Sequence, residues 1–159
     1  MIAPTSTPSS RPSGPGDPPR RPHPVHVFLD ASALIYLVEG RPPFAAGVRT
    51  AVQALQADQG PLQAAVSRLT WLECRVGPLR SGDVGVLAAY DDFFARPDLV
   101  WVELDQDVVE LATAIRARER LRTPDALQAA CCLQLGPRHV MLTGDAAFGC
   151  VPGLNVRVV

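Results

Sequence analysis

The chain has 159 residues, 47% of them hydrophobic, so it is long enough for one domain with a substantial core. Its formal net charge of −1 excludes a global attraction to nucleic acid and leaves any such binding to a local patch. All 15 basic residues are Arg, and the lack of Lys excludes a Schiff base, a catalytic lysine and a P-loop lysine.

Residues 1–24 differ in composition from the rest of the chain. They are dense in Pro, Ser and Gly and nearly free of large apolar side chains. Such a segment buries too little apolar surface to offset its ordering entropy, so we expect a disordered tail there. A passive tail is the simpler interpretation, although its arginines could contribute to nucleic-acid binding. We therefore expect one folded domain at residues 25–159.

The first half of this domain alternates between short apolar runs and amphipathic segments. VHVFLD (25–30) predicts a strand, and the next residues predict a helix that Gly40 closes. Apolar residues at helical spacing predict a second helix at 45–58. LQAAVS (62–67) predicts another strand, and the segment that follows predicts a helix ended by Gly77 and Pro78.

The second half continues the alternation. We expect a helix at 82–95, strands at 99–104, 139–143 and 155–159, and a short helical turn after Asp145. Asp105 is expected to cap a helix reaching about Leu121, and Thr123 to cap the next helix, with Pro124 in its first turn. The last strand is expected to lie at an edge. This order predicts an α/β fold with a mainly parallel sheet covered by helices on both faces.

Four acidic residues fall where a predicted strand gives way to a helix, or just inside that helix: Asp30, Glu73, Asp125 and Asp145. In a parallel sheet these positions share the edge at the carboxyl ends of the strands. Carboxylates gathered there would repel one another, so a divalent cation among them makes physical sense. Mg²⁺ takes hard oxygen ligands and works with phosphates, so it is the natural candidate.

Three of these acids also have a structural interpretation. Asp30 could accept backbone N–H groups at the start of a helix, although Ser32 competes for that position. Asp125 suits the positive end of a helix and could pair with Arg122. Asp145 could cap the short turn that follows it.

Glu73 is harder to explain structurally. Its helical neighbours at three and four residues are Leu69, Thr70, Val76 and Gly77, and none is a cation. A carboxylate on that largely apolar face needs a partner or a function, because its desolvation is costly.

The remaining reactive residue types give weaker signals. The four cysteines have no metal-ligand spacing, so we expect buried small hydrophobic side chains in a reducing compartment. We assign no role to the three histidines. No apolar run approaches the roughly 20 residues that span a membrane, and the start lacks a secretory signal, so we expect a cytoplasmic protein.

Four segments in this order resemble the PIN-domain family and, within it, the VapC-type toxins of toxin–antitoxin pairs. They are VFLDASALIYLV (27–38), SRLTWLECRVGP (67–78), TPDALQAACCLQLG (123–136) and MLTGDAAFGCVPGLNV (141–156). The resemblance covers essentially residues 25–159. The chain departs from the family pattern at Gly144, where Asn or a charged residue is common, at the bulky Trp71 and in the N-terminal tail.

The resemblance implies a PIN-like three-layer sandwich, with four to five strands, that acts as a metal-dependent endoribonuclease. Asp30, Asp125 and Asp145 would be the ligands of Mg²⁺, for which Mn²⁺ could substitute, and Glu73 would orient a coordinated water or position the ion. Ser32 and Thr143 would be hydrogen-bond partners of the ligands. The family also implies a homodimer and a cognate antitoxin.

An acidic cleft that accepts RNA needs positive charge beside it. The segment RARERLR (116–122) places Arg116 and Arg120 on one helix face and Arg118 and Arg122 on another. These arginines could hold RNA phosphates. The alternative is a solvated helix face balanced by Glu119.

Two other functions are also compatible with the sequence. A PIN-like fold could bind RNA or a partner without catalysis. An Asp-nucleophile phosphatase is less favoured, because Ser32 stands where such enzymes usually have a second Asp and no downstream Lys exists.

Overall fold

The computed structural model describes residues 23–159, so nearly all of the expected tail at 1–24 lies outside the described residues. The described part forms these elements in chain order: β1 (Val25–Leu29), α1 (Ala31–Val38), α2 (Phe44–Gln59), β2 (Leu62–Ser67), α3 (Arg68–Ser81), α4 (Val84–Phe94), β3 (Val100–Val102), α5 (Gln106–Glu119), α6 (Thr123–Leu133), β4 (His139–Thr143), the 3₁₀ helix η1 (Ala146–Cys150) and β5 (Val156–Val158).

The strands form one five-stranded sheet in the order β3-β2-β1-β4-β5, and every neighbouring pair is parallel. The central strand β1 pairs Val27 with Ala64 of β2 and with Val140 of β4. β5 pairs only with β4 and is an edge strand, as predicted.

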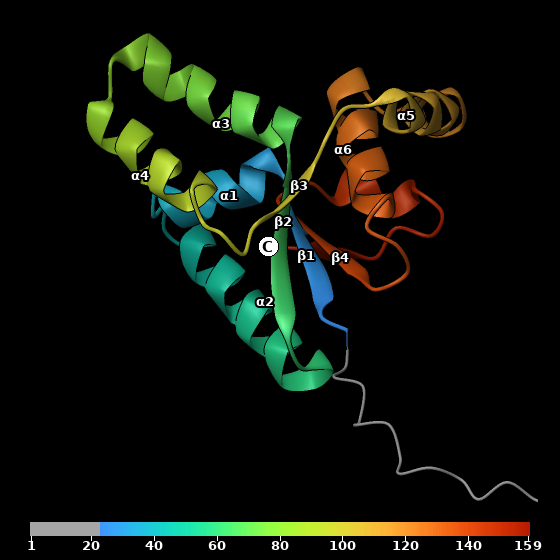
Figure 1. The fold of residues 1–159 in the computed structure, drawn as a ribbon, viewed down its shortest axis with the longest axis horizontal. Coiled ribbons are helices and arrows are strands. Elements are labelled where there is room, and N and C mark those ends of the chain that lie inside the picture. The colour runs from blue at the N-terminus through green and yellow to red at the C-terminus, as the bar shows by residue number, and fades with distance from the viewer. Residues whose placement is uncertain (1–22) are drawn as a thin grey trace, which may run out of the picture.

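Helices cover both faces of this sheet and make a three-layer sandwich. In Figure 1, α1, α2 and α4 lie on one side of the strands and α5 and α6 on the other. Alternate side chains of β1 enter the two cores, Val27 and Leu29 on the α1 side and Phe28 on the α6 side. Strands buried on both faces must be apolar throughout, which is why β1 and β4 are nearly continuous apolar runs. The predicted α/β sandwich, a parallel sheet with helices on both faces, is confirmed.

The predicted end of α3 is wrong. The helix continues through Pro78 to Ser81 and ends at Gly82, whose φ of 71° is left-handed. Pro78 lacks an N–H, but it lies in the last turn, where it costs one intrahelical bond, and its ring is buried. The carbonyl of Pro78 accepts from the N–H groups of Gly82 and Asp83, which closes the helix as glycine C-caps commonly do.

Three smaller expectations also need correction. Arg122, not Thr123, is the N-cap of α6, and no side chain caps that helix. The strand β3 covers only Val100–Val102 of the expected 99–104. Cys150 is exposed, whereas the other three cysteines are buried as expected.

Candidate active site

The four predicted acidic residues line one cleft of about 480 Å³. Asp30 lies between β1 and α1, Glu73 on α3, Asp125 in the first turn of α6, and Asp145 between β4 and η1. Parallel strand order explains the gathering of Asp30, Glu73 and Asp145, because chain segments that leave the carboxyl ends of adjacent strands emerge at the same edge. Asp125 follows α5 instead of a strand, and it lines the cleft because α6 begins beside it.

Asp30 is the most deeply placed of the four, with 6% of its surface exposed. Its Oδ1 accepts from the Ser32 hydroxyl at 2.7 Å and from the Ala33 N–H at 2.9 Å. Its Oδ2 accepts from the Thr143 hydroxyl at 2.7 Å. Asp30 therefore caps α1 and lines the cleft at once. Burial raises the pKa of its carboxyl, and these hydrogen bonds offset part of the rise.

Ser32 and Thr143 connect Asp30 to the segment that carries Asp145. The Thr143 hydroxyl accepts from the Asp145 N–H at 3.0 Å, and the Ser32 hydroxyl accepts from the Gly144 N–H at 2.8 Å. Each hydroxyl thus donates to Asp30 and accepts from the β4–η1 connection. The two predicted hydrogen-bond partners fix the ends of β1 and β4 relative to each other.

Gly144, a departure from the family pattern, has a local structural reason. A Cβ added there would lie 2.9 Å from Cε2 of Tyr36 and 3.2 Å from the Ser32 hydroxyl. Tyr36 is held in place by stacking on Phe44, with 4.6 Å between the ring centroids. The close approach of Tyr36 leaves no ready space for a side chain at this position.

Asp125 and Asp145 are the more accessible pair. Asp145 is exposed, and its Oδ1 accepts from the Ala147 N–H at 2.8 Å. Burial and the charge of Asp145 raise the pKa of Asp125, while the charge of Arg122 opposes the rise. No ion pair within residues 23–159 includes any of the four acids.

Gln128 is a buried residue of the cleft that the sequence reasoning missed. Its Nε2 donates to Glu73 Oε2 at 3.0 Å and to the Thr70 hydroxyl at 3.2 Å. Its Oε1 accepts from the Ser67 hydroxyl at 2.7 Å. Thr70 in turn donates to the Leu29 carbonyl at 3.2 Å, so the network reaches the end of β1. The partner that Glu73 lacks on its own helix is an amide on α6.

The signal that could have identified Gln128 is its spacing. It lies three residues after Asp125, which puts both side chains on one face of α6. Both line the cleft.

Burial is the largest cause that raises the pKa of Glu73, and the charges of Asp30 and Asp125 raise it further, while the Gln128 hydrogen bond lowers it.

The cleft suits a hard cation that keeps bound waters better than a cation that is coordinated by protein ligands alone. No three His, Cys, Asp or Glu side chains in the described part of the chain are grouped closely enough to hold a metal by themselves, so Asp30, Asp125 and Asp145 do not form a preassembled ligand set. However, the cleft offers carboxylate oxygens without a cationic partner. Mg²⁺ typically keeps several waters and takes one or two carboxylates, which matches this donor set.

The predicted RNA-binding arginines lie outside the cleft. Arg116 and Arg120 line a separate groove between α5 and α6. Arg122 is absent from that lining and is close enough to Asp125 to affect its pKa.

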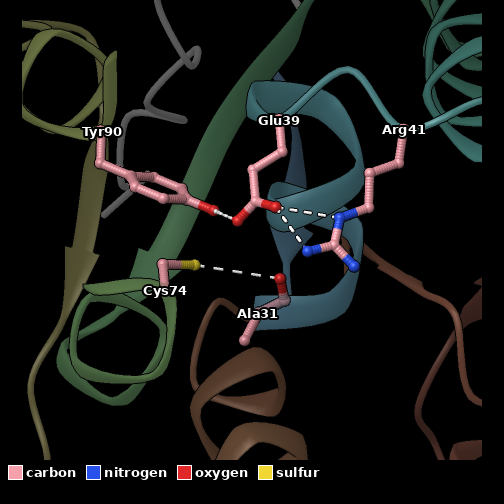
Figure 2. Close-up of polar contacts among 5 residues, drawn as sticks. All are labelled: Ala31, Glu39, Arg41, Cys74 and Tyr90. Atoms are coloured by element: carbon pink, nitrogen blue, oxygen red, sulfur yellow. Dashed lines mark hydrogen bonds and ion pairs between the residues drawn. The ribbon is translucent and has the colours of Figure 1, made fainter. Parts of the chain in front are cut away.

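A second polar cluster supports α1, whose start carries Asp30 (Figure 2). The Tyr90 hydroxyl donates to Glu39 Oε1 at 3.1 Å, and Arg41 donates to Glu39 Oε2 at 2.9 and 2.6 Å. The Cys74 thiol lies 3.9 Å from the Ala31 carbonyl, to which it donates. Burial raises the pKa of both Tyr90 and Cys74, so both stay protonated donors. These contacts tie α3 and α4 to α1.

The PIN-domain family model matches residues 27–153. A toxin–antitoxin complex from Klebsiella pneumoniae is similar at 30% identity and a TM-score of 0.58, covering 83% of this chain and 96% of the matched chain. VapBC2 from Rickettsia felis matches at 13% identity and a TM-score of 0.66, covering 84% and 98%. VapBC from Salmonella typhimurium matches at 18% identity and 0.64, also covering 84% and 98%. No curated protein matches the chain.

These similarities confirm the resemblance that the four sequence segments indicated. The two matches below 25% identity bear on the fold alone. Within residues 23–159, no helix is both long and apolar enough to cross a membrane.

Proposed function

This chain belongs to the PIN-domain family, and we propose that it is a metal-dependent endoribonuclease that acts as the toxin of a toxin–antitoxin pair. One observation carries the proposal. Four carboxylates from four separate segments line one cleft, and none of them pairs with an arginine of the described chain. Carboxylates that share a cleft repel one another, and a bound cation would offset this repulsion. A cation held in this way also suits the hydrolysis of a phosphodiester.

Asp30, Asp125 and Asp145 would hold the divalent cation, Mg²⁺ or Mn²⁺. When bound, the cation offsets the negative charge of a phosphodiester and makes water a better nucleophile at neutral pH. Ser32 and Thr143 would favour the ionised form of Asp30 and fix its position through their hydrogen bonds. The residues that line the cleft include neither His nor Lys, so the chain's own acid–base group there would be a carboxylate.

Glu73 would orient the attacking water and accept its proton. Gln128 holds Glu73 through Oε2 and leaves Oε1 for that water. Burial and neighbouring carboxylates raise the pKa of Glu73, which makes it a better proton acceptor than an ordinary glutamate. A fixed orientation matters because it reduces the entropy cost of bringing the water and the phosphate together.

The remaining proposals concern partners. The similar complex from Klebsiella pneumoniae is a toxin–antitoxin complex, which supports a cognate antitoxin for this chain. Trp71 and Leu72, 41% and 51% exposed on α3, are candidates for its docking surface, because Leu72 also lines the cleft. From the family resemblance we further propose a homodimer that acts in the cytoplasm, where its RNA substrate is found.

RNA cleavage by the purified protein tests the enzymatic proposal. We expect cleavage of single-stranded RNA with Mg²⁺ or Mn²⁺ and none with excess EDTA. Asp125→Asn should abolish it, whereas Asp58→Asn, which changes an exposed acid at the end of α2, should not. Asp125 is the better target than Asp30, since Asp30 also caps α1 and its loss could unfold the protein. Full activity in EDTA would contradict the proposal, and RNA binding without cleavage would favour a non-catalytic PIN-like module.

A further inference from the structure

A groove between α5 and α6 lies outside the acidic cleft and carries positive charge. It has a volume of about 730 Å³ and is lined by Thr113, Arg116, Ala117, Arg120 and Thr123. A smaller hollow of about 170 Å³ shares three of these residues and continues between the same helices toward Leu127. The groove is therefore a continuous feature of the α5–α6 pair, whose helices lie side by side in Figure 1.

The two arginines of the groove are available to a ligand. Both are exposed, and neither forms an ion pair within the described chain. Arg116 donates from one Nη to the Leu121 carbonyl at 3.2 Å, which orients its guanidinium and leaves its other N–H groups free to donate. Glu119, the balancing charge in the alternative interpretation of this segment, makes no ion pair with either of them in residues 23–159.

The hydroxyls of the groove are not equivalent. The Thr113 hydroxyl already donates to the Val109 carbonyl at 2.8 Å and can only accept. Thr123, the first residue of α6, adds a hydroxyl on the opposite side of the groove. The donors that can reach an anion are thus two guanidinium groups and one hydroxyl.

The groove adjoins the acidic cleft through α6. Asp125 and Gln128 line the cleft, whereas Thr123 and Leu127 of the same helix line the groove system. The first turns of α6 therefore separate the two hollows. Arg122, just before α6, lies close enough to Asp125 to oppose the rise of its pKa. Positive charge thus begins directly beside the carboxylates.

We propose that the groove formed by Arg116, Arg120 and Thr123 binds the sugar–phosphate backbone of single-stranded RNA while the scissile phosphate lies in the acidic cleft. This inference rests on the proposed ribonuclease function. The cleft itself repels phosphates unless its cation is bound, so the flanking RNA must gain its affinity elsewhere. Guanidinium groups suit this task, because their forked donors match phosphate oxygens.

The residues that line the groove also indicate which part of the RNA it contacts. No Phe, Tyr or Trp lines it, so it offers no stacking platform for bases. Contacts to phosphates fix the register of a nucleic acid but carry no sequence information. The groove therefore contributes affinity that is independent of sequence, and any preference for a cleavage motif comes from the cleft.

The test is RNA binding by the full-length protein in EDTA, which separates binding from cleavage. The probe is a fluorescein-labelled single-stranded RNA, followed by anisotropy across about 50–300 mM salt. We expect the double variant R116Q/R120Q to bind about five- to tenfold more weakly at about 0.1 M salt. The slope of log K against log salt should become shallower by about 1.4, or about 0.7 for each lost phosphate contact. R138Q is the matched control, because Arg138 is exposed and precedes β4 at the opposite edge of the sheet.

R120Q alone guards against a folding artefact, since Arg120 donates no side-chain hydrogen bond within the described chain, whereas Arg116 supports Leu121. It should show about half of the slope change. In cleavage assays with Mg²⁺, the double variant should raise KM by the same factor and leave kcat unchanged.

The outcomes distinguish failure of the groove proposal from failure of the ribonuclease proposal. If wild type cleaves RNA and the double variant binds with an unchanged affinity and salt slope, the groove proposal is overturned and the ribonuclease stands. If binding depends on the arginines but wild type never cleaves RNA, the groove stands and the ribonuclease fails. Polyglutamate that displaces the RNA as well as unlabelled RNA does would assign the groove to an acidic protein instead, and so overturn the proposal.

Discussion

Gln128 on α6 donates a hydrogen bond of 3.0 Å to the Glu73 carboxylate on α3, and so joins two segments that are 55 residues apart. The amide is buried and its other contacts, to Ser67 and Thr70, belong to the start of α3. Glu73 therefore owes its orientation to a neutral donor rather than to a cation. This keeps its negative charge available to the cleft.

Replacing Gln128 with Leu tests this relationship. The variant keeps the side-chain volume roughly constant but leaves the Ser67 hydroxyl and one Glu73 oxygen without their partner. We expect a loss of about 1–3 kcal/mol in the free energy of unfolding and a fall of about 10–100-fold in RNA cleavage, as for other residues that orient a site. Chemical denaturation and cleavage rates measure the two effects. Gln134→Leu, an exposed change on the residue after α6, is the control. Full activity of Gln128→Leu would show that Glu73 needs no orientation.

The raised pKa of Glu73 predicts a pH dependence of stability in the absence of metal. Its pKa is higher in the folded protein than in the unfolded chain, because of burial and the charges of Asp30 and Asp125. The folded state therefore binds the proton more tightly, and this stabilisation is fully present below the unfolded pKa of about 4.3. It is lost as the pH rises through the higher folded pKa.

Glu73→Gln should remove that dependence. With EDTA present, we expect the variant and wild type to have similar melting temperatures near pH 4 and the variant to be the more stable of the two near pH 7. Gln can still accept the hydrogen bond from Gln128, so packing is conserved. Thermal unfolding across this pH range gives the comparison. A variant that is less stable than wild type at neutral pH would mean that Glu73 is a stabilising structural charge.

Gly144→Ala should be destabilising through close contacts with Tyr36 and Ser32. The new Cβ would meet the tip of Tyr36 at 2.9 Å and the Ser32 hydroxyl at 3.2 Å. Because the tip of Tyr36 can shift slightly, we expect a cost of about 1 kcal/mol, at the low end for overpacking. Chemical denaturation measures it, and Gly149→Ala, where a Cβ meets nothing within 4 Å, is the control. Adding Tyr36→Leu should recover most of the loss, and failure to recover it would show that the contact with Tyr36 is not its cause.

Tyr90→Phe should lower the free energy of unfolding and leave the cleavage rate almost unchanged. The change removes the donor to Glu39 Oε1 (Figure 2) and leaves Arg41 paired with Oε2. We expect a loss of about 1–2 kcal/mol in the free energy of unfolding, because the acceptor is charged and the phenol is buried. The cleavage rate below the melting temperature should stay within about twofold of wild type, since a loss of roughly 0.4 kcal/mol or less at the site changes a rate by no more. A large loss of activity in a folded variant would extend the site to this cluster.

Much of the fold followed from local sequence patterns, because strand and helix periodicities alternate and parallel order fixes one functional edge. Asp30, Glu73 and Asp145 could be located at that edge from their position after strands, whereas Asp125 follows the helix α5, so its place there depends on how α6 packs. The spacing of Gln128 from Asp125 places both on one face of α6, but its contact with Glu73 could not be predicted, since that contact depends on α3 and α6 meeting in three dimensions. The end of α3 was missed for a related reason. Pro78 normally ends a helix, but tertiary packing of its ring outweighs the loss of one hydrogen bond.

The central claim is that carboxylates from separate segments form one divalent-cation site, and calorimetric titration of the metal-free protein with Mn²⁺ and Mg²⁺ tests it most directly. We predict saturable binding by wild type and Asp58→Asn and a loss of at least about tenfold in affinity for Asp125→Asn, as expected when a ligand that contributes roughly 1.4 kcal/mol or more is removed. No binding by wild type, or an unchanged affinity in Asp125→Asn, would contradict a divalent-cation site formed by these carboxylates.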